Sequence, residues 1–285
     1  MADDYSSYRA RRAVIAAAAA LLFAGCAAAP PHRDAIHELS EFETLAADER
    51  VRYEPGARDY AERVAAILPA AIAQVEAGHY RPFAAPVVVY VCGGDACFAR
   101  NMPGAARFTA AIVYNNRLVL APRLFDREPE RLYPILTHEL SHLHLGQRLG
   151  HYTMRIPVWF HEGLASLAAG GGGADLVNEE EARRMVVAGS HFLPDERHDE
   201  TRRKNGDQWQ LKISMFYRQS MMFLAHLRAL GEERFRRLVL ELQDRGRFDD
   251  VFAATFGGAA LELAHEFFSG LRCGRLECSD PAGAP

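Results

Sequence analysis

The segment His-Glu-Leu-Ser-His at residues 138–142 is the part of the chain whose spacing points most directly to chemistry. Residues four apart on a helix lie about 40° apart around its axis and about one turn along it. His138 and His142 can therefore direct one ring nitrogen each to a single metal ion. Glu139 follows the first histidine and would reach the flank of that ion, where a carboxylate can accept a proton from an attacking water. This pattern is typical of zinc-dependent hydrolysis.

A catalytic zinc ion usually has three protein ligands and one open position, so the pattern needs a third ligand. One kind of zinc site continues the motif along the chain, with a glycine at position 145 and a third histidine ligand at position 148. This longer motif is excluded here, because those positions hold Leu145 and Arg148. A glutamate on the next predicted helix is the alternative, and Glu162 within Trp-Phe-His-Glu-Gly-Leu-Ala-Ser (159–166) supplies it. The 19 intervening residues are enough for a loop and a helical turn to bring the carboxylate to the metal.

Together, the segments HELSH and WFHEGLAS resemble the gluzincin (peptidase MA-like) clan of zinc peptidases, which includes thermolysin and the membrane alanyl aminopeptidases. The resemblance implies that His138, His142 and Glu162 bind one catalytic Zn²⁺ and that Glu139 is the general base. It also implies a zincin-like α+β fold, with a small mixed β-sheet lobe and a helical lobe flanking the metal cleft. The Gly-Ala-Met-Glu-Asn motif of the aminopeptidases is absent, so we expect an endopeptidase acting on a peptide or protein substrate.

Several neighbouring residues are candidates for supporting roles. By the same resemblance Tyr217 is a candidate donor to the oxyanion; its alternative is a core aromatic, and His191 and His198 are fallback donors. Ser166, one turn after Glu162, either orients that carboxylate or packs. We expect His161 to face away from the metal. His144 and His151 are expected to be surface or packing residues. The clan binds substrate along an exposed strand, which suggests that residues Ala110, Ala111 and Tyr114 lie near the peptide.

The elements that must position these side chains follow from periodicity and from turn residues. Strands early in the chain and helices later favour an α+β arrangement. Asn115 and Asn116 suit a tight hairpin turn, because asparagine tolerates a positive φ. Residues 174–210 are polar with little periodicity and suit a loop or lid. We predict strands at 86–92, 108–114 and 117–120, and helices at 59–77, 129–145, 157–170, 213–230, 232–243 and 261–271.

The N-terminus has the pattern of an export signal. Three arginines precede an apolar run at 13–24 that ends in small residues before Cys26, which is typical of a signal peptide. The end of that run resembles a lipoprotein processing site and implies a lipid on Cys26; plain secretion and an uncleaved anchor are the alternatives. We therefore predict a signal peptide at 1–25, a tether at 26–50 and the zincin-like domain at 51–285. The expected location is the bacterial cell envelope, with the chain anchored on a membrane leaflet that faces the periplasm.

The other four cysteines fall into two closely spaced pairs, Cys92 with Cys97 and Cys273 with Cys278. An oxidising compartment permits disulfides, and we favour the two local pairings. A structural zinc site is the rival interpretation.

The composition fits a globular protein, with 49% hydrophobic and 25% charged residues. The formal charge of -4 argues against a nucleic-acid partner. The function predicted is therefore a zinc-dependent metallopeptidase of the envelope. The alternative is a non-catalytic envelope lipoprotein that binds a partner, in which zinc is a structural plug with a fourth ligand such as His191 or His198.

Overall fold

The computed structural model describes residues 39, 41–102, 104–105, 109–114, 116–194 and 205–272. Several sequence-based predictions fall outside these ranges. They are the signal peptide at 1–25 with the lipidated Cys26, the turn residue Asn115, the histidine His198, and the pair Cys273 and Cys278.

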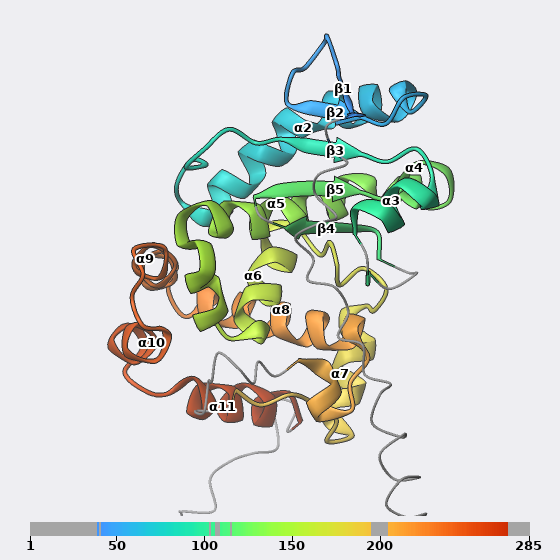
Figure 1. Ribbon diagram of the computed structural model, residues 1–285. Helices are drawn as coiled ribbons and strands as arrows, with labels where there is room; N and C mark the ends of the chain where they lie inside the picture. The colour runs from blue at the N-terminus through green and yellow to red at the C-terminus, as the bar shows by residue number, and fades with distance from the viewer. Residues whose placement is uncertain are drawn as a thin grey trace, which may run out of the picture.

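Five strands form one mixed sheet in the order β1-β2-β3-β5-β4. The three inner strands β2, β3 and β5 are parallel, whereas β1 and β4 pair antiparallel at the two edges. Figure 1 shows the sheet with α2 packed along it and α5 beneath the β4 side. The strands are β1 (Glu43–Thr44), β2 (Val51–Tyr53), β3 (Val89–Val91), β4 (Ala111–Tyr114) and β5 (Arg117–Leu120).

The predicted hairpin is confirmed, because β4 and β5 pair antiparallel from Tyr114 with Arg117 to Ala111 with Leu120. Asn116 has the positive φ of 60° that the tight turn requires. The strand predicted at 86–92 is shorter, at Val89–Val91.

The folded part of the chain begins within the segment predicted as a tether. β1 lies inside the segment 26–50, and it pairs with β2 through Glu43 with Tyr53. Leu45 is buried in the core beneath the sheet. The folded body therefore includes residues before 51, because a short edge strand and one apolar anchor are enough to attach the chain to the sheet.

Ten α-helices cover the described part of the chain, with short 3₁₀ turns at Pro129–Arg131, Gly150–Arg155 and Gly206–Trp209. The helix at 232–243 begins and ends as predicted, and those at 213–230 and 261–271 differ by about one residue at their ends. The helices are α2 (Arg58–His79), α3 (Asp95–Asn101), α4 (Arg123–Asp126), α5 (Leu132–Leu149), α6 (Val158–Ala168), α7 (Glu179–Val187), α8 (Ile213–Ala229), α9 (Glu232–Gln243), α10 (Phe248–Phe256) and α11 (Ala260–Arg272).

Two predicted helix ends were wrong. α2 continues through Gly78, and Tyr80 takes the left-handed conformation that ends it. α5 continues through Gly146 because Leu145 and Leu149 are buried in the helical core, and this packing outweighs the low helix propensity of glycine. Helices α3, α4 and α10 were not predicted.

The segment predicted as a loop or lid contains a packed helix. Asn178 caps α7 by accepting a hydrogen bond from the backbone N–H of Glu181. Val186 and Phe192 are fully buried in the helical core. The prediction of an irregular segment was therefore wrong for residues 179–187, which form α7, whereas residues 188–194 have no regular secondary structure but place Phe192 in the helical core.

The fold has two main apolar cores. One lies between the sheet, α2 and the N-terminal half of α5. The other lies among α6 to α11 and includes the C-terminal end of α5. Figure 1 shows α5 and α6 between the sheet above and the helical layer below. Helix α5 thus joins the two cores.

Cys92 and Cys97 form a disulfide between the end of β3 and α3, the local pairing favoured from the sequence. Within the described ranges, none of the helices combines the length and the apolar character needed to span a membrane.

Candidate metal centre

Helix α5 holds two of the candidate ligands in place by burying the face opposite to them. Leu136, Leu140 and Leu143 are fully buried in the sheet core. This apolar stripe fixes the rotation of the helix about its axis. His138, which is 3% exposed, and the half-buried His142 therefore point from α5 towards α6.

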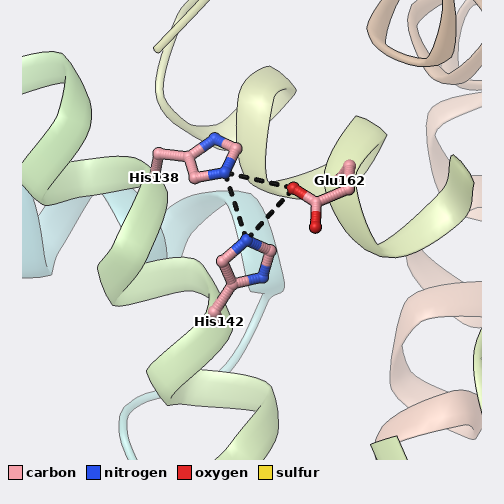
Figure 2. A group of neighbouring side chains, drawn as sticks. All are labelled: His138, His142 and Glu162. Carbon is pink, nitrogen blue, oxygen red and sulfur yellow. Dashed lines mark hydrogen bonds and ion pairs between the residues drawn. The ribbon is translucent and has the colours of Figure 1, made fainter. Parts of the chain in front are cut away.

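Helix α6 brings the third ligand from the helical lobe. Trp159, Phe160 and Leu164 are buried in the helical core and anchor α6 there. Gly163 lies so close to α8 that a Cβ at this position would be 2.9 Å from the carbonyl oxygen of Ser220. Close contact with α8 leaves the other side of α6 facing α5, and Glu162 projects from that side (Figure 2).

Three ligand atoms converge between the helices (Figure 2). The Nε2 atoms of His138 and His142 are 3.1 Å apart, and each lies 3.3 Å from Oε2 of Glu162. Ligand atoms on a tetrahedral zinc ion are roughly 3.3 Å apart when the metal–ligand bonds are near 2.0 Å. Within the described ranges, these three residues are the group of His, Cys, Asp or Glu side chains that can hold a metal ion.

The hydrogen-bond partners of the three candidate ligands are also consistent with a bound cation. Nδ1 of His138 is 2.9 Å from the carbonyl oxygen of Gly172, which can only accept, so Nδ1 carries the proton and a neutral ring has a free lone pair on Nε2. Oε2 of Glu162 is buried and has no hydrogen-bond donor in the described part of the chain. Electron-rich atoms that face one another in a buried site are stabilised by a cation.

The Glu162 carboxylate is ionised. Burial raises its pKa, but in the metal-free site the adjacent His142 and His138 rings, when they carry a proton towards the carboxylate, lower it by a larger amount, so that the pKa lies well below its ordinary value of 4.5. The carboxylate is therefore available as an anionic ligand.

Glu139 lines the same cleft as the three ligands. Burial raises its pKa, the His142 and His138 rings lower it, and the negative charge of Glu162 raises it; the net shift is upward from 4.5. An upward shift strengthens a carboxylate as a proton acceptor near neutral pH.

Tyr217 lies against the first ligand. Its ring stacks on His138, with the ring centroids 5.7 Å apart and the planes 17° apart. Burial and the charges of Glu162 and Glu139 raise its pKa well above 10, so the phenol remains a hydrogen-bond donor. It also packs against the helical core while lining the cleft, so both sequence-based interpretations of this residue describe part of its surroundings.

Other predicted neighbours differ from expectation. Ser166 is buried, and its hydroxyl lies 3.5 Å from Nδ1 of His138 rather than orienting Glu162. His161 was expected to face away from the metal, and it is not in the ligand group, but its Nε2 contacts the second ligand from behind, 3.2 Å from Nδ1 of His142. The contact forms because α6 packs directly against α5 and the residue before Glu162 faces the second histidine.

Three further histidines named from the sequence lie outside the triad in the described part of the chain. His144 is buried and its Nε2 donates to the carbonyl oxygen of Arg81, which makes it a packing residue. His151 is exposed at the mouth of the cleft. His191 stacks on Phe268 and contacts its neighbour's carbonyl oxygen, so it neither completes the metal site nor acts as a fallback donor there.

A cleft of about 1220 Å³ leads to the triad. Edge strand β4 lines part of it through Ala111 and Tyr114, and Ala110, which directly precedes the strand, lines it too. The 3₁₀ turn at Gly150–Arg155 and the start of α8 line other parts. This volume exceeds the roughly 300–1,000 Å³ of typical small-molecule pockets.

Sequence reasoning missed two groups that touch the ligands, the Gly172 carbonyl and the His161 ring. The run of four glycines at 170–173 was the available signal for the first. Comparison with protein-family models, with curated proteins and with solved structures found no match to this chain.

Proposed function

We propose that this protein is a zinc-dependent peptidase with a gluzincin-like centre in a zincin-like fold. The observation that carries the proposal is the convergence of His138, His142 and Glu162 at zinc-like separations, with Glu139 beside them in an open cleft. A structural metal site is usually closed by a fourth protein ligand, whereas a catalytic site keeps one position for water or substrate. The group in the described ranges has three members.

Zinc, when bound, supplies Lewis-acid chemistry that polarises a carbonyl group and makes water more acidic. Glu139 accepts the proton of the attacking water and then delivers it to the amine of the leaving peptide. Tyr217 donates a hydrogen bond to the oxygen of the tetrahedral intermediate. Its raised pKa keeps the donor proton in place.

The substrate is an extended segment of a peptide or protein. Strand β4 is an edge strand that pairs with β5 on one side and faces the cleft on the other. A substrate that adds to this edge as an antiparallel strand would make backbone hydrogen bonds with β4 and carry a peptide bond past the triad.

The experiment is a peptidase assay with metal analysis of Glu139→Gln. The variant should retain zinc, because Glu139 is not in the ligand group, and should lose peptide hydrolysis by several orders of magnitude. Glu130→Gln is the matched control, since Glu130 is an exposed acid just before α5. Unchanged activity of Glu139→Gln would refute the general-base role. A wild-type protein that binds zinc but hydrolyses no peptide would favour a partner-binding role instead.

We also propose that the chain is a lipid-anchored protein of the bacterial envelope. The proposal is supported by the arginine-rich start, the apolar run at 13–24 and the small residues before Cys26. Expression of the full chain with a labelled fatty acid tests it. Label that enters the wild type but not Cys26→Ser supports the anchor, and equal labelling of the two excludes it.

A further inference from the structure

The loop after α6 returns to the first candidate ligand. The carbonyl oxygen of Gly172 accepts a hydrogen bond from Nδ1 of His138 over 2.9 Å, and both groups are buried. The loop therefore determines which nitrogen of His138 carries the proton, and it leaves Nε2 directed at His142 and Glu162. The glycine run at 170–173 thus has a role beyond ending α6.

Two of these glycines, Gly172 and Gly173, allow the loop to lie directly against α5 and the His138 ring. A Cβ at Gly172 would lie 2.1 Å from the carbonyl oxygen of Pro134 in the first turn of α5. A Cβ at Gly173 would lie 2.6 Å from the His138 ring, and Gly173 has a φ of +79°. Side chains at these positions would push the loop away from α5 or rotate the His138 ring.

The loop is also held from its other side. The guanidinium of Arg218, on α8, donates from Nε to the carbonyl oxygen of Val177 over 2.6 Å and from Nη2 to that of Ala174 over 3.0 Å. Asp175 pairs with Arg131 just before α5. One arginine therefore binds two carbonyl groups within the four residues after the glycine run, and an ion pair ties the same stretch to the start of the ligand helix.

We propose that the segment 170–177 is a ligand-positioning loop and that Arg218 is its positioning residue. The loop holds the His138 ring in the orientation and tautomer that present Nε2 to a metal ion. Loss of the hydrogen-bond partner of the non-ligating nitrogen of a metal-binding histidine typically weakens metal affinity about 10- to 100-fold. Arg218 itself touches neither metal nor substrate, so its effect is transmitted through the Gly172 carbonyl. This inference rests on the proposed zinc centre.

The test measures the zinc dissociation constant by competition with a chelating dye. Arg218→Ala removes both donors to the loop, and Gly173→Ala forces the loop away from the ring. We expect zinc binding about 10- to 100-fold weaker in each variant. Arg218→Lys keeps the charge and can donate to one of the two carbonyl groups, so its affinity should lie between those of the wild type and Arg218→Ala.

Gly189→Ala is the matched control for backbone strain. Gly189 has a φ of +82°, like Gly173, but nothing lies within 4 Å of the Cβ that alanine would add. It should lose stability as Gly173→Ala does and retain wild-type zinc affinity. Circular dichroism of each metal-free protein checks folding, and the absorption spectrum of the Co²⁺-substituted protein reports the ligand geometry.

The outcomes separate the two proposals. A wild-type chain that binds no zinc would overturn the metal centre and the loop's role together. Zinc binding by the wild type with equal affinity in folded Gly173→Ala and Arg218→Ala would overturn the loop's role alone. If Arg218→Ala does not fold, the comparison of Gly173→Ala with Gly189→Ala decides. Weaker zinc binding and an altered Co²⁺ spectrum in Gly173→Ala alone would support the loop's role in positioning His138. Equal effects in the two variants would refute that role.

Discussion

A buried histidine behind the ligand helix makes the stability of the fold depend on pH. His79, at the C-terminal end of α2, is fully buried, and its Nε2 lies 2.7 Å from the hydroxyl oxygen of Ser141 on α5. The His144 ring lies beside it, with the centroids 4.5 Å apart. Burial, followed by the neighbouring histidines and Arg148, lowers the pKa of His79 well below its ordinary value of 6.5.

The sign of the effect follows from which state binds the proton. The folded state keeps His79 neutral, whereas the unfolded chain protonates it as the pH falls below 6.5. The stability from this residue is therefore present above pH 6.5 and is lost on acidification. For one histidine that stays neutral in the folded state, the free energy of unfolding falls by about 1.4 kcal/mol between pH 7.5 and pH 5.5. The pKa of His144 is lowered by burial too, so it changes stability in the same direction.

The assay is urea unfolding of metal-free protein at pH 7.5 and pH 5.5, for the wild type and His79→Gln. Glutamine can keep a hydrogen bond to Ser141 and does not titrate. All other titrating groups contribute to both proteins, so they cancel when the two pH-dependent losses are subtracted. The wild type should lose about 1.4 kcal/mol more than the variant. Equal losses would show that His79 is protonated in the folded state and would refute the reasoning.

Three further predictions concern the metal, the helix contact and the helical core. Zinc at about 100 times its dissociation constant should stabilise the wild type by about 2.7 kcal/mol, seen as a higher unfolding temperature, and His142→Ala should remove the shift. Gly163→Ala should cost about 1–3 kcal/mol in urea unfolding, because the added Cβ would meet the Ser220 carbonyl at 2.9 Å; an unchanged midpoint would contradict this. Phe192→Ala should cost about 3–5 kcal/mol, since the ring is fully buried and stacks with Trp159; a loss below 1 kcal/mol would mean that this segment is a mobile lid after all.

The three ligands could be predicted because each lies in a helix with strong local signals. His138 and His142 share a helix whose leucine stripe is visible in the sequence, and Glu162 follows Pro157, which precedes the first residue of α6. The groups behind the ligands could not be predicted in this way. The Gly172 carbonyl meets His138 across 34 positions, and that contact depends on how the loop after α6 returns to α5.

The errors in the fold have a common physical origin. α7 has a good cap and i,i+4 pairs such as Glu179 with Arg183, but it buries only Ala182 and Val186 along its length. A helix with so little apolar surface has weak periodicity, and its position is determined by contacts with α8 and α11. β1 has only two residues, so its existence depends on pairing with β2 rather than on its own sequence.

The metal-binding side chains lie where the two apolar cores meet, and this placement connects stability with chemistry. Leu140 on α5 belongs to the sheet core, whereas Leu149 on the same helix and Leu164 on α6 belong to the helical core. An ion held by His138 and Glu162 would join α5 to α6 at this boundary. When both rings are neutral and no cation is bound, the acceptor atoms there repel one another, so packing on either side must hold them together. The close contact of α6 with α8 and the glycine loop against α5 supply that packing, which prepares the site before any ion binds.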